Sequence, residues 1–225
     1  MEYFNIFEGT FISRPNRFIA NVKIDNEVHV CHVKNTGRCR ELLTENATVF
    51  LEKAQNPMRK TQFDLVSVIK GEKIINMDSF APNICAEEFF KSKYKKVLHE
   101  VKYKNSRFDL FIEDTKTFVE VKGVTLEKDN IAMFPDAPTE RGRKHILELI
   151  DAKNNGYNAE ILFVIQFENA KKFIPNYKTD LKFKEALLSA QKAGVKIRAM
   201  DCKVTKNTMA INNEVEVCLD SLLPI

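Results

Sequence analysis

Two neighbouring segments near the middle of the chain constrain its fold most strongly. Residues Ser106–Ile112 read as a strand that contains Asp109, and Phe118–Val124 read as a second strand that contains Glu120 and Lys122. Residues two apart on a strand point to the same face, so Glu120 and Lys122 project together. If the two strands pair as a hairpin, Asp109 can lie beside Glu120. We therefore expect two carboxylates and an ammonium to share one small volume.

This grouping suits a divalent metal that acts on a phosphate ester. Mg²⁺ prefers oxygen ligands and usually takes one or two protein carboxylates, completing its shell with water and substrate phosphate. Asp109 and Glu120 would supply those oxygens, and Lys122 would orient the attacking water or stabilise charge on the phosphate. The pattern predicts catalytic roles for these three residues and Mg²⁺ or Mn²⁺ as the cofactor. The alternative is a charge pair on an exposed strand face that serves only solubility.

Length and cysteine usage limit the class of protein. The 225 residues suffice for one large domain or two small ones, and 44% hydrophobic residues can fill their cores. No apolar stretch approaches the roughly 20 residues that span a bilayer, and the first residues lack the pattern of a signal peptide. The five cysteines are scattered and include no Cys-x-x-Cys, which disfavours a disulfide framework. We expect a cytoplasmic protein without a membrane partner.

A basic segment precedes the expected hairpin. Although the net charge of the chain is only +4, this stretch carries seven cations against the single acid Glu100. The cations are Lys91, Lys93, Lys95, Lys96, Lys102, Lys104 and Arg107. Such a cluster can neutralise several backbone phosphates, and binding would then weaken with salt. A solvated helix face would have a similar composition, and Glu100 is expected to pair with Arg107.

The first 80 residues read as short strands separated by turns. The expected strands are Ile6–Ser13, Phe18–Ile24, Val28–Val33, Thr48–Glu52 and Phe63–Lys70. Five short strands in this length favour a small barrel of the OB type, an architecture that commonly binds single strands or oligosaccharides. We predict an OB-like β-barrel over residues 1–80.

From Ala81 the pattern changes to alternating helices and strands. A helix opened by Pro82 precedes the hairpin, and two later helices are expected at Arg141–Lys153 and Leu181–Ala193. Strands are expected at Ala159–Gln166 and Lys196–Met200. We predict an α/β domain over residues 81–225, in contact with the barrel.

Three ordered motifs resemble the sugar fermentation stimulation protein family. They are Ser106–Asp109, Glu120–Leu126 and the segment Phe134–His145, which reads FPDAPTERGRKH. In the first half, His32 followed by the turn Asn35-Thr36-Gly37, and Arg59-Lys60, also match the family. The chain departs from the family pattern at Lys34, Cys39 and Pro138, where relatives usually have proline, methionine and valine.

The resemblance implies an N-terminal OB-type barrel followed by a domain of the PD-(D/E)xK nuclease fold. It also implies DNA as a partner and, in bacteria, regulation of sugar (maltose) metabolism. Asp109, Glu120 and Lys122 fall on the nuclease-fold signature, with ten residues between the two acids. Glu88 resembles the extra acid that such nucleases place beside the metal, and an exposed helix glutamate is the equal alternative.

The segment before the second expected helix is a candidate phosphate clamp. Thr139 can cap the helix, whose free N–H groups and partial positive charge favour an anion. Cations in its first turns would strengthen that field, and Asp136 would hold the loop or touch a metal-bound water. His145 could shuttle a proton. The predicted phosphate- or DNA-binding residues are thus Lys93, Lys95, Lys96, Arg107, Thr139, Arg141, Arg143 and Lys144. An ordinary capped helix is the alternative.

Three functions remain open from the sequence. The first is a DNA-binding protein with a nuclease-type metal site that acts as a regulator, and the second is an active Mg²⁺-dependent nuclease. The third is a barrel that binds an oligosaccharide, for which stacking aromatics are expected, yet the chain has no tryptophan. The sequence leaves the oligomeric state and the preferred nucleic acid open.

Overall fold

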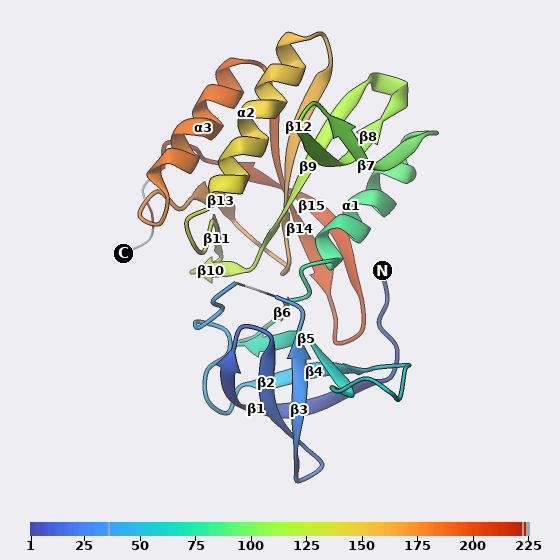
Figure 1. The fold of residues 1–225 in the computed structure, drawn as a ribbon. Helices are drawn as coiled ribbons and strands as arrows, with labels where there is room; N and C mark the ends of the chain where they lie inside the picture. Colours follow the sequence, from blue (N-terminus) through green and yellow to red (C-terminus); the bar gives the residue numbers. More distant parts are fainter. Residues whose placement is uncertain (36, 222, 224–225) are drawn as a thin grey trace.

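The computed structural model describes residues 1–35, 37–221 and 223 as a barrel joined to a larger α/β domain (Figure 1). Thr36, in the predicted turn Asn35-Thr36-Gly37, lies outside the described residues. Within the described ranges, no helix is long and apolar enough to cross a membrane.

The barrel consists of short antiparallel strands that close through one parallel pair. Its strands are β1 (Ile6–Asn16), β2 (Ile19–Ile24), β3 (Glu27–Val33), β4 (Thr48–Lys53) and β5 (Phe63–Lys70), with β6 (Lys73–Asn76) added beside β5. The sheet order is β3-β2-β1-β4-β5-β6, and β3 pairs with β5 through His32 opposite Asp64 and Val33 opposite Leu65. This closure confirms the OB-like barrel. The sequence did not predict β6.

The second domain contains one large mixed sheet and three helices. Its elements are α1 (Ala81–Lys91), β7 (Val97–Tyr103), β8 (Ser106–Ile112), the 3-10 turn η1 (Glu113–Thr115), β9 (Thr117–Val124), β10 (Leu126–Lys128), β11 (Ile131–Phe134), α2 (Glu140–Asn154), β12 (Asn158–Ile165), β13 (Lys172–Pro175), α3 (Leu181–Lys192), β14 (Lys196–Val204) and β15 (Met209–Val217). In the described residues the strand order is β10-β11-β13-β15-β14-β12-β9-β8-β7. The predicted helices and hairpin are present, whereas β10, β11, β13 and β15 were not predicted.

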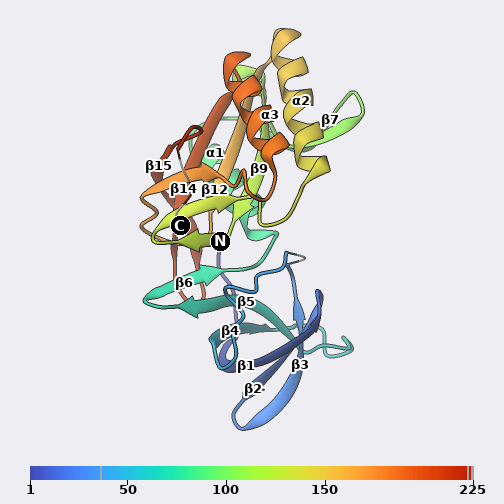
Figure 2. The same ribbon diagram turned by 90° about the vertical axis from the view of Figure 1, so that its left-hand side faces the viewer.

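Helices cover both faces of this sheet. Helices α2 and α3 pack together on one face, and α1 packs on the other, against β9 and β15 (Figure 2). Strand β12 lies between β9 and β14 with parallel neighbours on both sides, and its residues from Ala159 to Ile165 are all buried. A continuous apolar run is what a central parallel strand requires, because both of its faces are covered.

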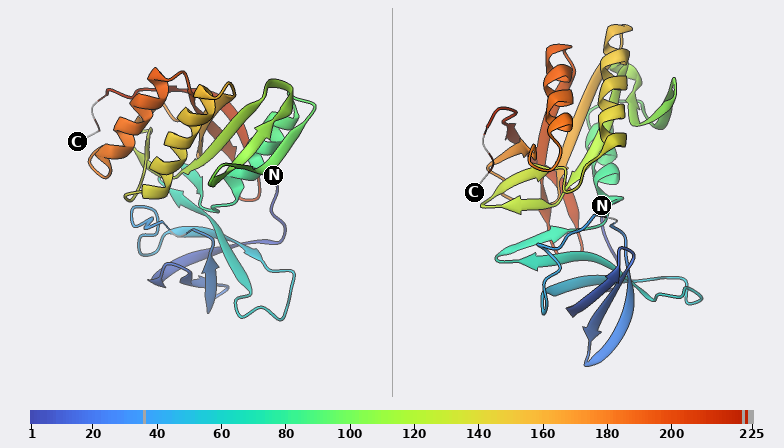
Figure 3. Two further views of the ribbon diagram at one scale, coloured as in Figure 1. Left: turned by 45° about the horizontal axis from the view of Figure 1, so that its top comes forward. Right: turned by 60° about the vertical axis from the view of Figure 1, so that its left-hand side comes forward.

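The two domains are joined by more than the single connection before α1. Buried Gln166, directly after β12, accepts the Asn76 N–H through its backbone oxygen at 2.9 Å. Its side-chain amide donates to the Asp78 carbonyl at 3.1 Å. On the other side, Glu2 bridges to Thr208, and the Tyr3 N–H donates to the Asn207 carbonyl at 2.7 Å. The residues before β1 therefore run along the second domain, and the barrel lies below it in both views of Figure 3.

Candidate functional site

The hairpin of β8 and β9 separates at the point where Asp109 lies. The two strands pair through Leu110–Ile112 opposite Thr117–Val119, so the next position of the register places Asp109 opposite Glu120. Here a side chain accepts a hydrogen bond in place of the neighbouring strand's backbone: Oδ2 of Asp109 accepts the backbone N–H of Val121 at 2.7 Å. Its Oδ1 accepts a hydrogen bond of 2.9 Å from Nδ2 of Asn83, on α1. Asp109 is thus fixed by a strand and a helix.

Glu120 is the most deeply buried acid of the site, with 2% of its surface exposed. Its Oε1 accepts a hydrogen bond from Nζ of Lys122 and another from Nδ1 of His145, on α2. Among the described residues, no group donates to its other oxygen, Oε2. An unpartnered carboxylate oxygen in a buried position is costly and rare in native proteins. Glu120 therefore presents one free oxygen inside the site.

The electrostatics of the two carboxylates differ. Burial raises the pKa of Asp109 above its usual value, and the negative charge of Glu120 adds to the increase. Burial also acts to raise the pKa of Glu120, but the hydrogen bond from His145 and the charge of Lys122 outweigh it, so this pKa is lowered. Glu120 is therefore the charged partner. A further positive charge near Asp109 would favour ionisation of both acids.

The donors of the site fit a hard cation that retains part of its water shell. Within the described residues, no group of three or more His, Cys, Asp or Glu side chains is arranged to hold a metal ion. Mg²⁺ does not require such a cage, because it usually binds one or two carboxylates together with water and phosphate oxygens. Asp109 and the free Oε2 of Glu120 meet that lower requirement.

Glu88, predicted as a third metal ligand, points its carboxylate elsewhere. Its Oε2 accepts from the N-terminal ammonium of Met1 at 2.8 Å. Its neighbour Glu87 instead lines a cavity together with Asp109. No contact of the described residues supports Glu88 as a ligand, so that role stays a prediction. The expected pair of Glu100 and Arg107 is present, at 3.1 Å.

Three of the predicted phosphate-binding residues meet at one cavity. Arg107, near the start of β8, lines a cavity of about 480 Å³ with Arg141 and Lys144, from the first turns of α2. His145, which contacts Glu120, lines the same cavity. The sequence separates Arg107 from the other two by more than 30 positions, and the fold joins the three into a basic rim next to Asp109 and Glu120. We call this set the basic rim.

The remaining predicted phosphate-binding residues lie apart from the basic rim or serve structural contacts. Thr139 caps α2 as predicted, accepting the Gly142 N–H, and Arg143 pairs with the buried Asp180 at 2.6 Å. Lys93 lies 3.9 Å above the Phe89 ring, and Lys96 pairs with Glu113 at 2.6 Å. Lys95 is exposed in the same stretch. The alternative interpretation of this basic segment was a solvated helix face. The segment does not form a helix, because α1 ends at Lys91 and a turn follows.

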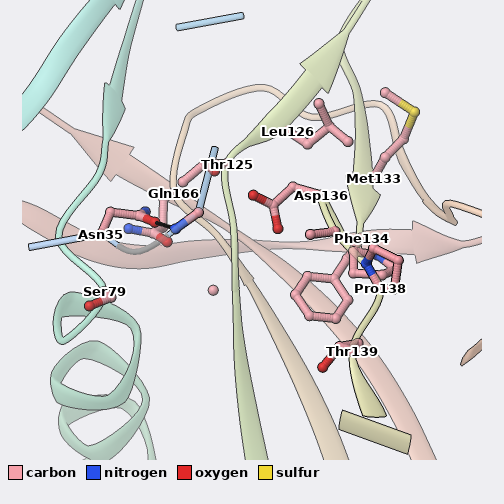
Figure 4. A pocket seen from close by; sticks show the side chains of 14 residues that line it. Asn35, Ser79, Thr125, Leu126, Met133, Phe134, Asp136, Pro138, Thr139 and Gln166 are labelled. Carbon is pink, nitrogen blue, oxygen red and sulfur yellow. Dashed lines mark hydrogen bonds between the residues drawn. The ribbon is translucent and has the colours of Figure 1, made fainter. Parts of the chain in front are cut away.

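A separate cavity of about 340 Å³ lies between the barrel and the second domain. Figure 4 shows Asp136 directed into it, with Asn35 and Gln166 on one side and Phe134 and Pro138 on the other. Oδ2 of Asp136 accepts the Arg38 N–H at 3.2 Å, across the domain boundary. This contact is of the kind that the predicted loop-holding role of Asp136 requires. Contact with a metal-bound water stays a prediction.

Sequence reasoning missed Asn83 and understated His145. Asn83 follows Pro82 in the first turn of α1, a position that looks like ordinary helix capping until α1 is packed against β8. The sequence suggests for His145 only an optional proton shuttle that a metal mechanism does not need, whereas in the structure its imidazole is buried and hydrogen-bonded to Glu120. A buried histidine on the apolar face of α2 was the available signal, since such a residue needs a polar partner.

Comparison with known proteins then decides the family. The model described as "SfsA N-terminal OB domain" matches residues 12–77, and the one described as "Sugar fermentation stimulation protein RE domain" matches residues 77–208. The chain belongs to the sugar fermentation stimulation protein family. This confirms the family resemblance and the order of an OB barrel followed by an α/β domain.

Relatives in the sugar fermentation stimulation protein family cover nearly the whole chain. The homologues from Ruminiclostridium cellulolyticum and Desulfitobacterium hafniense (strain DSM 10664 / DCB-2) are 54% and 51% identical, each over 97% of this chain and over 100% and 99% of their own lengths. A solved structure of Pyrococcus furiosus SfsA in complex with Ca²⁺ is similar with a TM-score of 0.84 and 29% identity. It covers 96% of this chain and 97% of that chain.

Proposed function

We propose that this protein binds DNA and hydrolyses its phosphodiester bonds at a divalent-metal site formed by Asp109 and Glu120. The observation that carries the proposal is the buried Oε2 of Glu120, for which the described residues offer no donor. Asp109 lies beside it with a pKa raised by burial and by the Glu120 charge. Two adjacent carboxylates, one of them buried with a free oxygen, would take up a further positive charge, which a divalent cation would supply.

The residues around Glu120 have distinct roles in this proposal. A bound divalent cation supplies Lewis acidity and lowers the pKa of a coordinated water. His145 and Lys122 both donate to Oε1 of Glu120, which keeps this carboxylate ionised and leaves Oε2 for the cation. The Lys122 ammonium also places a positive charge at the edge of the site, where it would stabilise charge that develops on a phosphate.

Two further observations support nucleic acid and a cation as ligands. The basic rim (Arg107, Arg141 and Lys144) lines a cavity that His145 connects to Glu120, so the strand would pass the carboxylates while cations hold its backbone. The Pyrococcus furiosus relative was solved in complex with Ca²⁺. Because Ca²⁺ and Mg²⁺ both take oxygen ligands, that complex supports a cation in this family.

Regulation and sugar binding remain separate predictions. The family name links its members to sugar fermentation, and a DNA-binding protein can act on sugar genes without cutting. No contact described above favours an oligosaccharide in the barrel. We therefore treat binding without cleavage as an outcome of the test.

The test is cleavage of labelled single-stranded, duplex and branched DNA and of RNA, with Mg²⁺, Mn²⁺ or EDTA. We expect metal-dependent cleavage by the wild type and a loss of about a thousandfold in Asp109→Asn. The matched control is Asp114→Asn, an exposed acid at the far end of the hairpin. Glu88→Gln tests the third-ligand prediction separately. Cleavage retained in Asp109→Asn would contradict the proposal, and binding without cleavage would favour a regulator.

Binding is tested through its salt dependence. Replacement of Arg107, Arg141 and Lys144 by glutamine should weaken DNA binding and flatten the dependence of affinity on salt, because fewer counterions are released. The matched triple variant at Lys93, Lys95 and Lys96 measures the cluster predicted from sequence. If only the second variant changes the slope, the strand follows the basic segment after α1 and not the basic rim.

A further inference from the structure

An apolar ledge adjoins Asp109 at the start of α1. Phe80 and Ile84 lie four residues apart at the start of α1, so they share one face of the helix. Phe80 is 67% exposed and Ile84 is 40% exposed. Together with Asp109 they line a cavity of about 390 Å³. Large apolar side chains that are exposed to water next to such carboxylates are typical of a ligand-binding surface.

The ledge is rigidly connected to the carboxylates. Asn83, one residue before Ile84, donates to Oδ1 of Asp109 at 2.9 Å. The Phe80 N–H donates to Oδ1 of the buried Asp78 at 2.9 Å, and the Phe80 carbonyl accepts from the Ile84 N–H at 3.3 Å. The backbone that presents the phenyl ring is therefore fixed at both ends. A group resting on the ring would hold a constant position relative to Asp109.

The charges around this cavity select a neutral ligand. Its rim carries Glu87, Glu100 and Asp109 against the imidazole of His99. Glu87 contacts His99 at 3.1 Å, and Glu100 contacts Arg107 at 3.1 Å. No excess of cations faces the cavity, so a phosphate is poorly accommodated. A planar base with an apolar face and amino-group donors fits both the ledge and the acceptors.

We propose that Phe80 and Ile84 form a stacking platform for an unpaired nucleobase next to the phosphate that is cut. This inference rests on the proposed function and names its substrate class as single-stranded or locally unpaired nucleic acid. A base inside a duplex has neighbours on both faces and cannot stack on a side chain. Bases of single strands stack on exposed aromatic rings with little dependence on sequence. Phe80 is then a positioning residue for the substrate strand.

The absence of tryptophan from the sequence permits a direct test. Phe80→Trp introduces a single fluorescent indole at the platform, and Leu147→Trp introduces one at a comparably exposed position, 57% exposed, on α2. We expect a single-stranded oligonucleotide, added in EDTA, to quench the indole of Phe80→Trp and leave that of Leu147→Trp unchanged. A blunt duplex should quench neither.

Affinity gives the second readout. By fluorescence anisotropy of a labelled strand in EDTA, Phe80→Ala should weaken single-strand binding by about 5- to 150-fold, the range for loss of one stacked base. Ile84→Ala should weaken it less, and Leu147→Ala should leave it unchanged. Because the Phe80 ring is mostly in water, circular dichroism and thermal unfolding of Phe80→Ala should match the wild type.

The outcomes separate this inference from the proposed function. If the strand quenches the indole of Phe80→Trp but no substrate is cleaved with metal, the platform stands and the nuclease proposal fails. If the wild type cleaves and both Phe80→Ala and Ile84→Ala bind and cleave single strands normally, the platform is refuted and the nuclease stands. A protein that binds no single strand at all refutes the platform as well.

Discussion

The two domains each bury a carboxylate cluster, and the clusters differ in how fully they are neutralised. In the barrel, Asp64 accepts two hydrogen bonds from Arg59, at 2.9 and 2.7 Å, and contacts Nδ1 of His32 at 3.1 Å. Nζ of Lys34 lies 3.8 Å away. In the second domain, Lys122 and His145 both donate to the same oxygen of Glu120. Both oxygens of Asp64 thus contact cations or donors, whereas one oxygen of Glu120 has no donor in the described part of the chain.

The pKa shifts of Asp64 and Asp109 differ in direction. Burial acts to raise the pKa of Asp64, but the hydrogen bonds from Arg59 and the charge of Lys34 outweigh it and lower the pKa. The pKa of Asp109 is raised instead, by burial and by Glu120. A neutralised buried acid stabilises its own domain. An acid whose pKa is raised by burial and by a neighbouring carboxylate costs stability when it is ionised, and such sites are typical of ligand binding and catalysis. From this difference we expect a structural role for the Asp64 cluster, whereas the Asp109 site has the electrostatic character on which the proposed function rests.

The largest stability effect should separate Asp64→Asn from Asp109→Asn. Asp64→Asn leaves Arg59, Lys34 and His32 facing an uncharged amide, so we expect a loss of about 2 to 3 kcal/mol in the free energy of unfolding. This is below the usual cost of breaking a fully buried pair, because Arg59 and Lys34 are partly exposed. Asp109→Asn removes a charge that burial and Glu120 disfavour, so it should cost less than about 1 kcal/mol. Urea denaturation in EDTA measures both, and equal losses would remove the contrast.

A smaller effect should follow from added divalent cation. A ligand that binds only the folded state at ten times its dissociation constant stabilises that state by about 1.4 kcal/mol. Thermal unfolding should therefore shift upward when Mg²⁺, Mn²⁺ or Ca²⁺ is added to the wild type or to Asp64→Asn. The same addition should leave Asp109→Asn unchanged. If the cation still raises the unfolding temperature of Asp109→Asn but not that of Asp64→Asn, the cation binds in the barrel and not at Asp109.

The smallest effect is expected in the pH dependence of stability, and its sign differs between the two acids. Asp64 has a folded pKa below the unfolded value, near 3.8, so its contribution is fully present above that pH. The contribution is lost as the pH falls through the lowered folded pKa. Asp109 has a raised folded pKa, so its contribution is present below the unfolded pKa and is lost as the pH rises through the folded one.

Unfolding free energies measured from about pH 3 to 6 would test these signs. The penalty of Asp64→Asn should shrink toward the acid end of the range. The penalty of Asp109→Asn should shrink, or become a gain, toward the upper end. Parallel curves for the wild type and both variants would show that neither acid titrates differently in the folded and unfolded states.

Much of the fold could be predicted because its strands and helices carry clear local patterns. The five barrel strands alternate or cluster β-branched and apolar residues, and α2 has a Thr139 cap that the structure retains. The missed strands lack such patterns. Strands β10, β11 and β13 span only three or four residues each, and β15 contains the polar run Asn212-Asn213-Glu214. In addition, β13 pairs with β11 and β15, which are distant from it in sequence, so only the assembled sheet defines these pairings.

The candidate site was predictable where it lies within one hairpin and not where packing decides. The pairing of Asp109 with Glu120 follows from strand register, and the structure brings both together. Glu87 and Glu88 are neighbours on α1, separated by about 100° around the helix axis. Which of them faces Asp109 depends on how α1 sits on the sheet, and the structure places Glu87 at that cavity. The sequence alone could not predict which of these two adjacent acids faces the site.

The antiparallel contact of Glu2 with Thr208 also has a mechanical consequence for the barrel. The chain enters the barrel from contacts with the second domain at Tyr3 and leaves it at Asp78, whose carbonyl binds Gln166. The barrel is held at further points, because Asp136 accepts the Arg38 N–H and Lys70 pairs with Glu127. A domain on one linker could tumble freely, whereas a body fixed at several separated points keeps its orientation. A strand lying across both domains would therefore meet a surface of fixed shape.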